Sequence, residues 1–263
     1  MLETARSIPS DTPRNAVLTT IAEVQAKAGD VPAALQTVQT IQGEDDEFQK
    51  ALALVRIGKV QAAHGDVAGA SEIFQNAVRT AEFIKDPVQT VHDIQGNTET
   101  RVMSMAFFCG VKLAAIALAQ SEAGGQAGSV ATFAKAVSTA RGMPDPRAGV
   151  VNYQAFSKDM LFSLIVKAQA KAGFVDDARK TASEIRVLPG LSRERGWGGG
   201  DPQVMAWYEI ARAQGLRAEP HDAVAWIEAL KGPTQKTYAL LGLAEGLLER
   251  VGVEPPENKL FDI

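Results

Sequence analysis

Histidine and aspartate stand next to each other at two places, His92-Asp93 and His221-Asp222. An imidazole and a carboxylate can ligate a transition metal and so activate water for hydrolysis. Such a centre needs further ligands on other helices, and His64 shares no predicted helix face with either pair. Simpler structural roles suffice, because His64 precedes a turn glycine and Asp222 fits a helix cap. We therefore predict no metal ion and no catalytic residue, and keep a metal-dependent hydrolase using His92 and Asp93 as the weakest alternative.

The glycine-rich segment 193–202 is the other stretch with an arrangement suited to chemistry, because glycine amides can cradle a phosphate. No Lys-Ser or Lys-Thr follows it and no predicted strand precedes it, so a phosphate loop is disfavoured. We expect a surface loop instead, with Arg193, Arg195 and Trp197 as its contact residues and Asp201-Pro202 starting the next helix.

Cys109 is the single cysteine, which excludes a disulfide within the chain. It lies in the apolar helical run from Met103 to Ala119, so we expect a packed thiol and no nucleophile. Lys112 interrupts the same run, which argues against a membrane span. The N-terminus shows no basic-then-apolar signal pattern. We expect a cytoplasmic protein, or a periplasmic one if a targeting segment lies outside this chain.

A helical hairpin is predicted for the stretch from Leu54 to Ala77, and imperfect copies of it recur along the chain. Each copy has an apolar anchor in its first helix. The anchors are Ile21, Ile57, Ile116, Ile165, Ile210 and Leu241. The residue four positions after each anchor is Gln25, Gln61, Gln120, Gln169, Gln214 or Glu245. We expect these amides to bond the neighbouring turn or one another, with ligand contact as the alternative.

The turn inside each hairpin repeats as well. Glycine stands there at Gly29, Gly65, Gly124 and Gly173, and Ala218 takes the same place in the fifth copy. Asp30, Asp66 and Glu219 follow as caps for the second helices. Small residues then come thirteen positions after the anchors, where two helices must approach closely. Periodicity of this kind predicts stacked helix pairs.

The best copy resembles the tetratricopeptide repeat in Leu54, Ile57-Gly58, Gln61, Ala70 and Phe74, with Leu54 at the family's Trp and Gln61 at its Tyr. The resemblance covers roughly nine tenths of the chain. It implies an all-α, right-handed α-solenoid of stacked antiparallel helix pairs. Residues 1–250 would form a single array of about five to six hairpins, and residues 251–263 a tail.

The array is expected to begin in a half-repeat, because Leu2 to Ile8 resembles Leu35 to Ile41, the second helix of a pair. Either the chain is a fragment of a longer array or a lone helix caps it. Extra residues fall before the first helices of later copies, at 86–99, 142–153 and 189–201, and should gather along one edge. We also expect the third and fourth first helices to be lengthened, from about Thr98 and Val151.

The tetratricopeptide resemblance also implies a concave groove, lined by first-helix residues two and six positions beyond each anchor. Cations outnumber anions at these positions, which suits an acidic peptide or a C-terminal carboxylate, with an ordinary solvated face as the alternative. The groove residues expected to contact a partner are Lys27, Lys59, Leu118, Lys167, Lys171, Tyr208 and Arg212.

Net charge is -4, so the chain lacks the generally basic footprint of a nucleic-acid-binding protein. We predict a non-enzymatic protein–protein interaction module that holds a protein or peptide segment in its groove, with no cofactor, no nucleic acid and no membrane contact. The alternative is the helical repeat domain of a larger enzyme or secretion complex. Self-association is also expected, because an array without a polar terminal cap exposes apolar edges.

Overall fold

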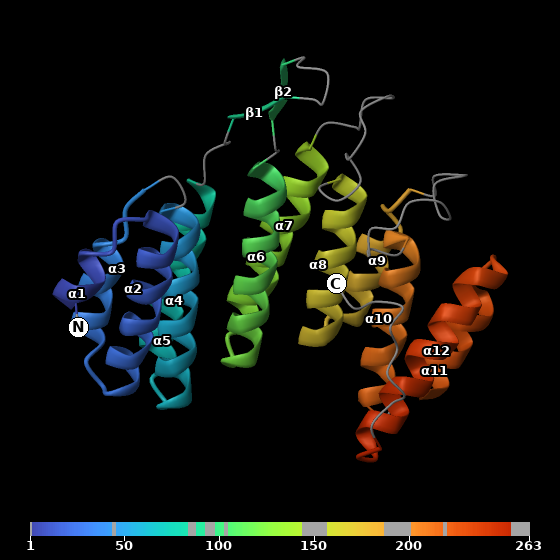
Figure 1. Ribbon diagram of the computed structural model, residues 1–263. Coiled ribbons are helices and arrows are strands. Elements are labelled where there is room, and N and C mark those ends of the chain that lie inside the picture. Colours follow the sequence, from blue (N-terminus) through green and yellow to red (C-terminus); the bar gives the residue numbers. More distant parts are fainter. Residues whose placement is uncertain are drawn as a thin grey trace. The chain divides into compact units, whose positions relative to one another are not determined.

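The computed structural model describes residues 2–43, 46–83, 88–92, 98–102, 105–143, 157–186, 201–217 and 220–253 (Figure 1). In these ranges the chain forms twelve helices and one short antiparallel hairpin. It divides into two compact units, which comprise Met1–Thr139 and Ala140–Ile263. The expected helical character is confirmed for this part of the chain. The single continuous superhelix stays a prediction.

The first unit contains seven helices. They are α1 (Leu2–Arg6), α2 (Asp11–Lys27), α3 (Val31–Gln39), α4 (Asp46–Ala63), α5 (Val67–Glu82), α6 (Met105–Glu122) and α7 (Gln126–Gly142), whose last residues belong to the second unit. Helix α2 packs on α1, α3 and α4, and α4 packs in turn on α3, α5 and α6. The first helices of successive pairs are therefore direct neighbours. Helix α2 starts at Asp11, after Ser10, which makes no side-chain cap.

Glycine turns join the helices of each pair, as predicted. Gly29, Gly65 and Gly124 have φ values of 87°, 88° and 81°, a left-handed conformation that side chains disfavour. The predicted caps also form, since Asp30 accepts from the amide of Ala33 at 3.0 Å and Asp66 accepts from Gly69 at 2.8 Å. The local signals for the hairpins thus match their structure.

A two-stranded hairpin lies between α5 and α6, where only extra length was expected. Strand β1 (Val88–His92) pairs antiparallel with β2 (Thr98–Val102), with Val88 opposite Val102 and His92 opposite Thr98. The prediction that a lengthened helix starts near Thr98 is therefore wrong. The residues Thr98, Thr100 and Val102 are β-branched and alternate with charged ones, which favours a strand.

The second unit contains five further helices, and α8 and α9 pack on each other and on α10. They are α8 (Lys158–Ala172), α9 (Val175–Ala182), α10 (Pro202–Leu216), α11 (Pro220–Ala229) and α12 (Pro233–Arg250). Ser157 caps α8 by accepting from the amide of Met160 at 3.1 Å, so α8 does not extend back to Val151 as predicted. Asp201 caps α10, as predicted, by accepting from Gln203 at 2.9 Å.

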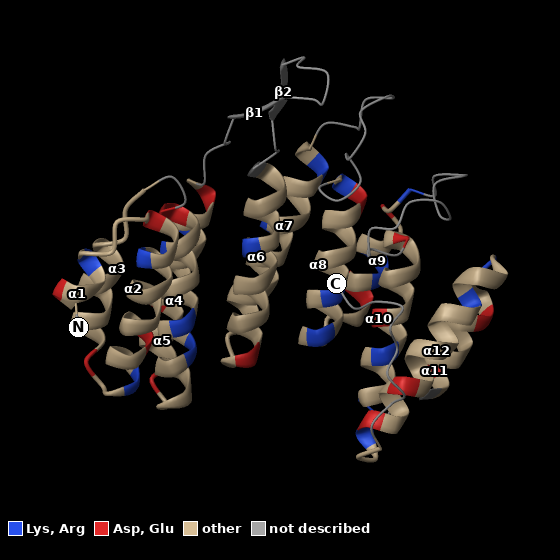
Figure 2. Cartoon of the chain, in the orientation of Figure 1, with Lys and Arg blue, Asp and Glu red and all other residues tan. Residues whose placement is uncertain are grey.

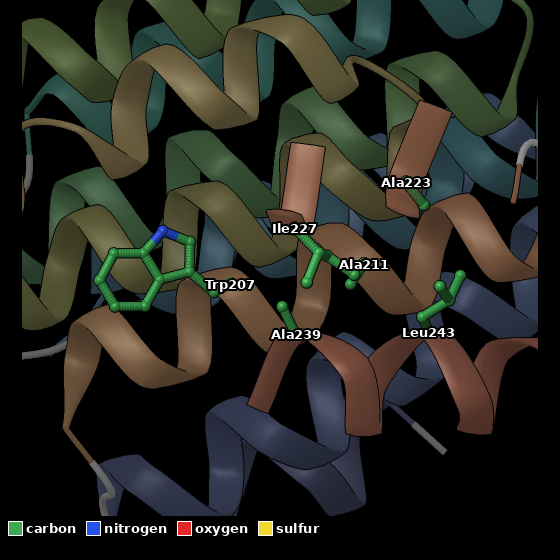
Figure 3. Close-up of a cluster of buried hydrophobic side chains, with 6 residues drawn as sticks. All are labelled: Trp207, Ala211, Ala223, Ile227, Ala239 and Leu243. Atoms are coloured by element: carbon green, nitrogen blue, oxygen red, sulfur yellow. The ribbon is translucent and has the colours of Figure 1, made fainter. Parts of the chain in front are cut away.

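The core of the second unit is built where α10, α11 and α12 meet (Figure 3). Each helix contributes two buried side chains to this cluster, which consists of Trp207, Ala211, Ala223, Ile227, Ala239 and Leu243. The alanines let the helix axes approach closely. Contact is closest at Gly242 and Gly246 of α12, where an added Cβ would lie 2.2 Å from a backbone oxygen of α10 in each case. These glycines fix the spacing of α10 and α12.

In the first unit, Phe74 of α5 is 2% exposed and lies against Gly58 of α4, whose missing side chain makes room for the ring.

Cys109 is half-buried on α6, and burial raises the pKa of its thiol to about 11, which keeps it protonated and unreactive at neutral pH. Within the described residues, no helix has the length and apolarity needed to cross a membrane.

Candidate functional site

The predicted groove cations lie on first helices, and three of them contact acidic residues of a neighbouring first helix. In the first unit, Lys59 of α4 pairs with Glu122 of α6 at 2.8 Å. In the second unit, Lys167 of α8 pairs with Glu209 of α10 at 2.9 Å. Figure 2 shows acidic and basic residues interspersed on the helices of both units. The face is therefore closer to electrical neutrality than the count of cations suggested.

Arg212 of α10 is the third of these cations. Its guanidinium pairs with Glu249 of α12 and also lies 3.9 Å from the carboxylate of Glu209 on its own helix. The side chain of Lys167 is 54% exposed while that of Glu209 is 14% exposed. The cation thus lies on the solvent side of its pair. An incoming carboxylate could contact Lys167 without displacing the buried acid.

One ion pair of the first unit and one of the second unit occupy equivalent positions relative to the anchors. Glu23, two residues after its anchor, pairs at 3.0 Å with Arg56, one residue before the next anchor. Lys167 and Glu209 stand at the same two positions with the charges exchanged. The helix pairs therefore bring the same positions together in both units, independently of the residue types that fill them.

The remaining groove residues differ in surroundings. Lys27 pairs with Glu23 at 2.7 Å, and this bond, with a smaller effect of Arg56, lowers the pKa of Glu23. Lys171 is exposed at the end of α8 and makes no ion pair with another described residue. Leu118 is half-buried on α6. Lys171 is consequently the groove cation most accessible to a partner.

Tyr208 is not a surface contact, which corrects its predicted role. It is 8% exposed, and its hydroxyl donates a hydrogen bond to the carboxylate of Glu245, which is 5% exposed on α12. Burial and the hydrogen bond to Glu245 raise the pKa of Tyr208. The pair holds α10 against α12 and does not offer the tyrosine ring to a ligand.

The equivalent glutamines have two kinds of environment. The hydroxyl of Thr37 donates to the side-chain oxygen of Gln25 at 2.7 Å, and the amide of Gln61 donates to Asp66 at 3.0 Å, which confirms structural bonding in the first two pairs. The next three, Gln120, Gln169 and Gln214, are at most 5% exposed, and their side-chain oxygens have no hydrogen-bond partner among the described residues.

Several predicted positions lie outside the described residues, namely Arg193, Arg195, Trp197 and Asp93. His92 ends β1. Helix α11 begins at Pro220, so Asp222 lies in its first turn and is not its cap, contrary to prediction. The described residues contain no cluster of three or more His, Cys, Asp or Glu side chains that could hold a metal ion.

The chain matches no protein-family model, no curated protein and no solved structure. Sequence reasoning selected the cations of the first-helix face but missed their acidic partners, Glu122, Glu209 and Glu249. The sequence held one signal for the ion pairs between neighbouring first helices: Glu209 and Arg56, which each pair with a residue of the preceding first helix, both stand one residue before an anchor.

Lys112 is a half-buried ammonium group with an unusual neighbour. It lies over the ring of Phe48 of α4, with Nζ 3.5 Å from the ring centroid. Burial, and to a lesser degree the charge of Arg56, lowers the pKa of Lys112 from 10.5 to about 8. The folded state therefore disfavours the charged form of this side chain.

Replacing Lys112 with methionine should raise the free energy of unfolding at pH 7 by about 1–2 kcal/mol, because the burial penalty exceeds the lost cation–π attraction. Between pH 8 and 10.5 the unfolded wild type binds more protons than the folded one, so wild-type stability rises through this window and the advantage of the variant shrinks. Urea unfolding of the wild type and the Lys112→Met variant at pH 7 and pH 10 measures the difference in their free energies of unfolding. Exposed Lys135→Met is the control, and a pH-independent difference for Lys112→Met would contradict the expectation.

Proposed function

We propose that the chain is a non-enzymatic binding module that holds an acidic segment of another protein against its first helices. The observation that supports this most is that exposed cations of the first helices form cross-helix ion pairs within each unit, with Lys59 50% and Lys167 54% exposed. Each unit has its own candidate surface: Lys59 lies on that of the first, and Lys167 and Arg212 lie on that of the second.

Exposed ion pairs are weak enough to exchange partners. A surface pair contributes about 0–1 kcal/mol, because water and salt screen the charges. A carboxylate of a bound segment can therefore share or replace Glu122 in the first unit, or Glu249 in the second, at little cost. Lys171 extends the surface as a cation without an acidic partner among the described residues.

The half-buried Leu118 of α6 adds an apolar contact next to the charges. It lies on the same helix as Glu122, one turn away, so the partner segment would carry an apolar residue beside its acids. An alternating acidic and apolar segment is thus the sequence type that fits this face.

The test is a pull-down from lysate of the source cells, comparing the wild type with the triple variant Lys59→Glu, Lys167→Glu and Arg212→Glu. A captured protein is identified and its acidic segment is rebound as a purified peptide. We expect the triple variant to lose at least about tenfold in affinity for that peptide, and wild-type binding to weaken as salt is raised.

A matched control carries the same change of charge elsewhere: Lys50→Glu, Lys135→Glu and Arg141→Glu, whose partners are Asp46, Glu82 and Glu184. Both triple variants are checked for wild-type helicity. Equal binding by the two triple variants would place the interaction elsewhere and overturn the proposal.

A further inference from the structure

A hollow of about 530 Å³ lies in the second unit between the turn that joins α8 to α9 and the end of α10. Gly173 and the first turn of α9 form one side, Gln214 of α10 and its C-cap residue Arg217 form another, and Asp222 of α11 also lines the hollow. This volume is within the range of small-molecule sites. The hollow is separate from the ion pairs described above.

Among the described residues around the hollow, one cation and one anion have no charged partner. Asp176 pairs with Arg179 at 3.5 Å, and Asp177 pairs with Lys180 at 3.1 Å. Arg179 is also held against Trp226, 5.0 Å from the ring centroid. Arg217 and Asp222 make no ion pair or side-chain hydrogen bond with another described residue. A ligand with one charge of each sign would satisfy both.

Gln214 adds an unsatisfied acceptor to this hollow. Its side chain is 2% exposed, and its Oε1 atom has no hydrogen-bond partner among the described residues. The equivalent Gln25 is satisfied by Thr37. A buried carbonyl without a donor is destabilising, and an N–H group of a ligand would supply the missing hydrogen bond.

The N-terminus of α9 supplies donors at the same place. Its N-cap residue is Phe174, which makes no side-chain cap hydrogen bond, whereas Asp30 and Asp66 cap the equivalent α3 and α5. Gly173, with φ 93°, lies so close to Arg217 that an added Cβ would be 1.9 Å from the guanidinium. Arg217 therefore lies beside the turn between the end of α8 and the start of α9, close to the partial positive charge at the N-terminus of α9.

We propose that this hollow binds a small zwitterion of the α-amino-acid type. Its carboxylate accepts hydrogen bonds from Arg217 and the first amides of α9, while its ammonium group donates to Asp222 and to Gln214 Oε1. The charges of such a ligand match two side chains that have no charged partner in the described part of the chain, and its N–H groups supply a donor to Gln214 Oε1, which has none there. Binding of this ligand does not depend on the proposed binding of an acidic protein segment.

Isothermal titration of the full chain with the individual free proteinogenic amino acids tests the ligand class. We expect at least one to bind, and its N-acetyl and carboxamide derivatives, which each lack one charge, to bind at least about tenfold more weakly. Absence of binding by the whole panel would overturn the proposal. Equal binding of the N-acetyl derivative would overturn it as well, because that compound has no ammonium group.

Two substitutions test the residues. Arg217→Gln and Asp222→Asn should each lower the affinity for the amino acid by about tenfold or more. Both side chains are exposed, so neither change should disturb helicity, and Arg250→Gln on α12 is the control. Unchanged affinity in both variants would contradict the assignment. The triple variant of Lys59, Lys167 and Arg212 should retain amino-acid binding, which distinguishes failure of this proposal from failure of the other.

Discussion

Gly246→Ala should lower the free energy of unfolding of the second unit by about 3 kcal/mol. An alanine Cβ would lie 2.2 Å from the backbone oxygen of Arg212 and 3.0 Å from its carbonyl carbon. Backbone atoms in a helix cannot move aside as a flexible side chain can, so α10 and α12 would have to separate. Separation would also stretch the contact between Tyr208 and Glu245. Urea unfolding followed by helical circular dichroism measures the loss.

Gly142→Ala is the matched control for this prediction. It makes the same chemical change, but nothing lies within 4 Å of the position of the added Cβ. We expect a neutral effect or a small gain in stability, since alanine loses less backbone entropy than glycine on folding. A similar loss in both variants would show that the close approach of α10 and α12 does not set stability.

Phe74→Ala should destabilise the first unit by about 3–5 kcal/mol, because it leaves a cavity between α4 and α5. Phe74 is 2% exposed, and its ring fills the space left by Gly58, where an added Cβ would be 2.8 Å from the ring. Adding Gly58→Ala to Phe74→Ala should recover part of the loss by filling some of the cavity. Thermal and urea unfolding of the single and double variants measure both effects.

Phe83→Ala is the control for Phe74, since it removes the same ring at a position that is 69% exposed. Its expected effect is below about 0.5 kcal/mol. A loss as large as that of Phe74→Ala would show that ring burial is not the cause. The double variant gives a second check, because a Gly58→Ala change that worsens Phe74→Ala would contradict the proposed fit between glycine and ring.

The hairpins could be predicted from sequence because their signals are local. Gly65 must take a left-handed conformation and Asp66 must cap the helix that follows, and both requirements are met within a few residues of chain. The β1–β2 pairing was missed because the helical periodicity on either side dominated the interpretation of the segment. The alternation from Thr98 to Val102 was a readable signal for it.

The candidate site was harder to predict, because it depends on contacts between distant residues. Lys59 and Glu122 lie far apart in sequence, and Glu122 stands six positions after its anchor whereas Glu209 stands one position before its own, so no common spacing points to the pair. The close approach of α10 and α12 was also missed. Gly242 and Gly246 are one helical turn apart and so share a face, a spacing that suits tight helix contact. The burial of Tyr208 follows from that contact.

The exchanged charges of Glu23–Arg56 and Lys167–Glu209 mean that the helix pairs are not interchangeable parts. If α8 were transplanted to the place of α2, Lys167 would meet Arg56. The reverse transplant would set Glu23 against Glu209. Like charges at such a distance repel, so each arrangement is disfavoured relative to the native one. Charge as well as shape therefore favours the native neighbours of α2 and α8, by the modest amount that exposed ion pairs contribute.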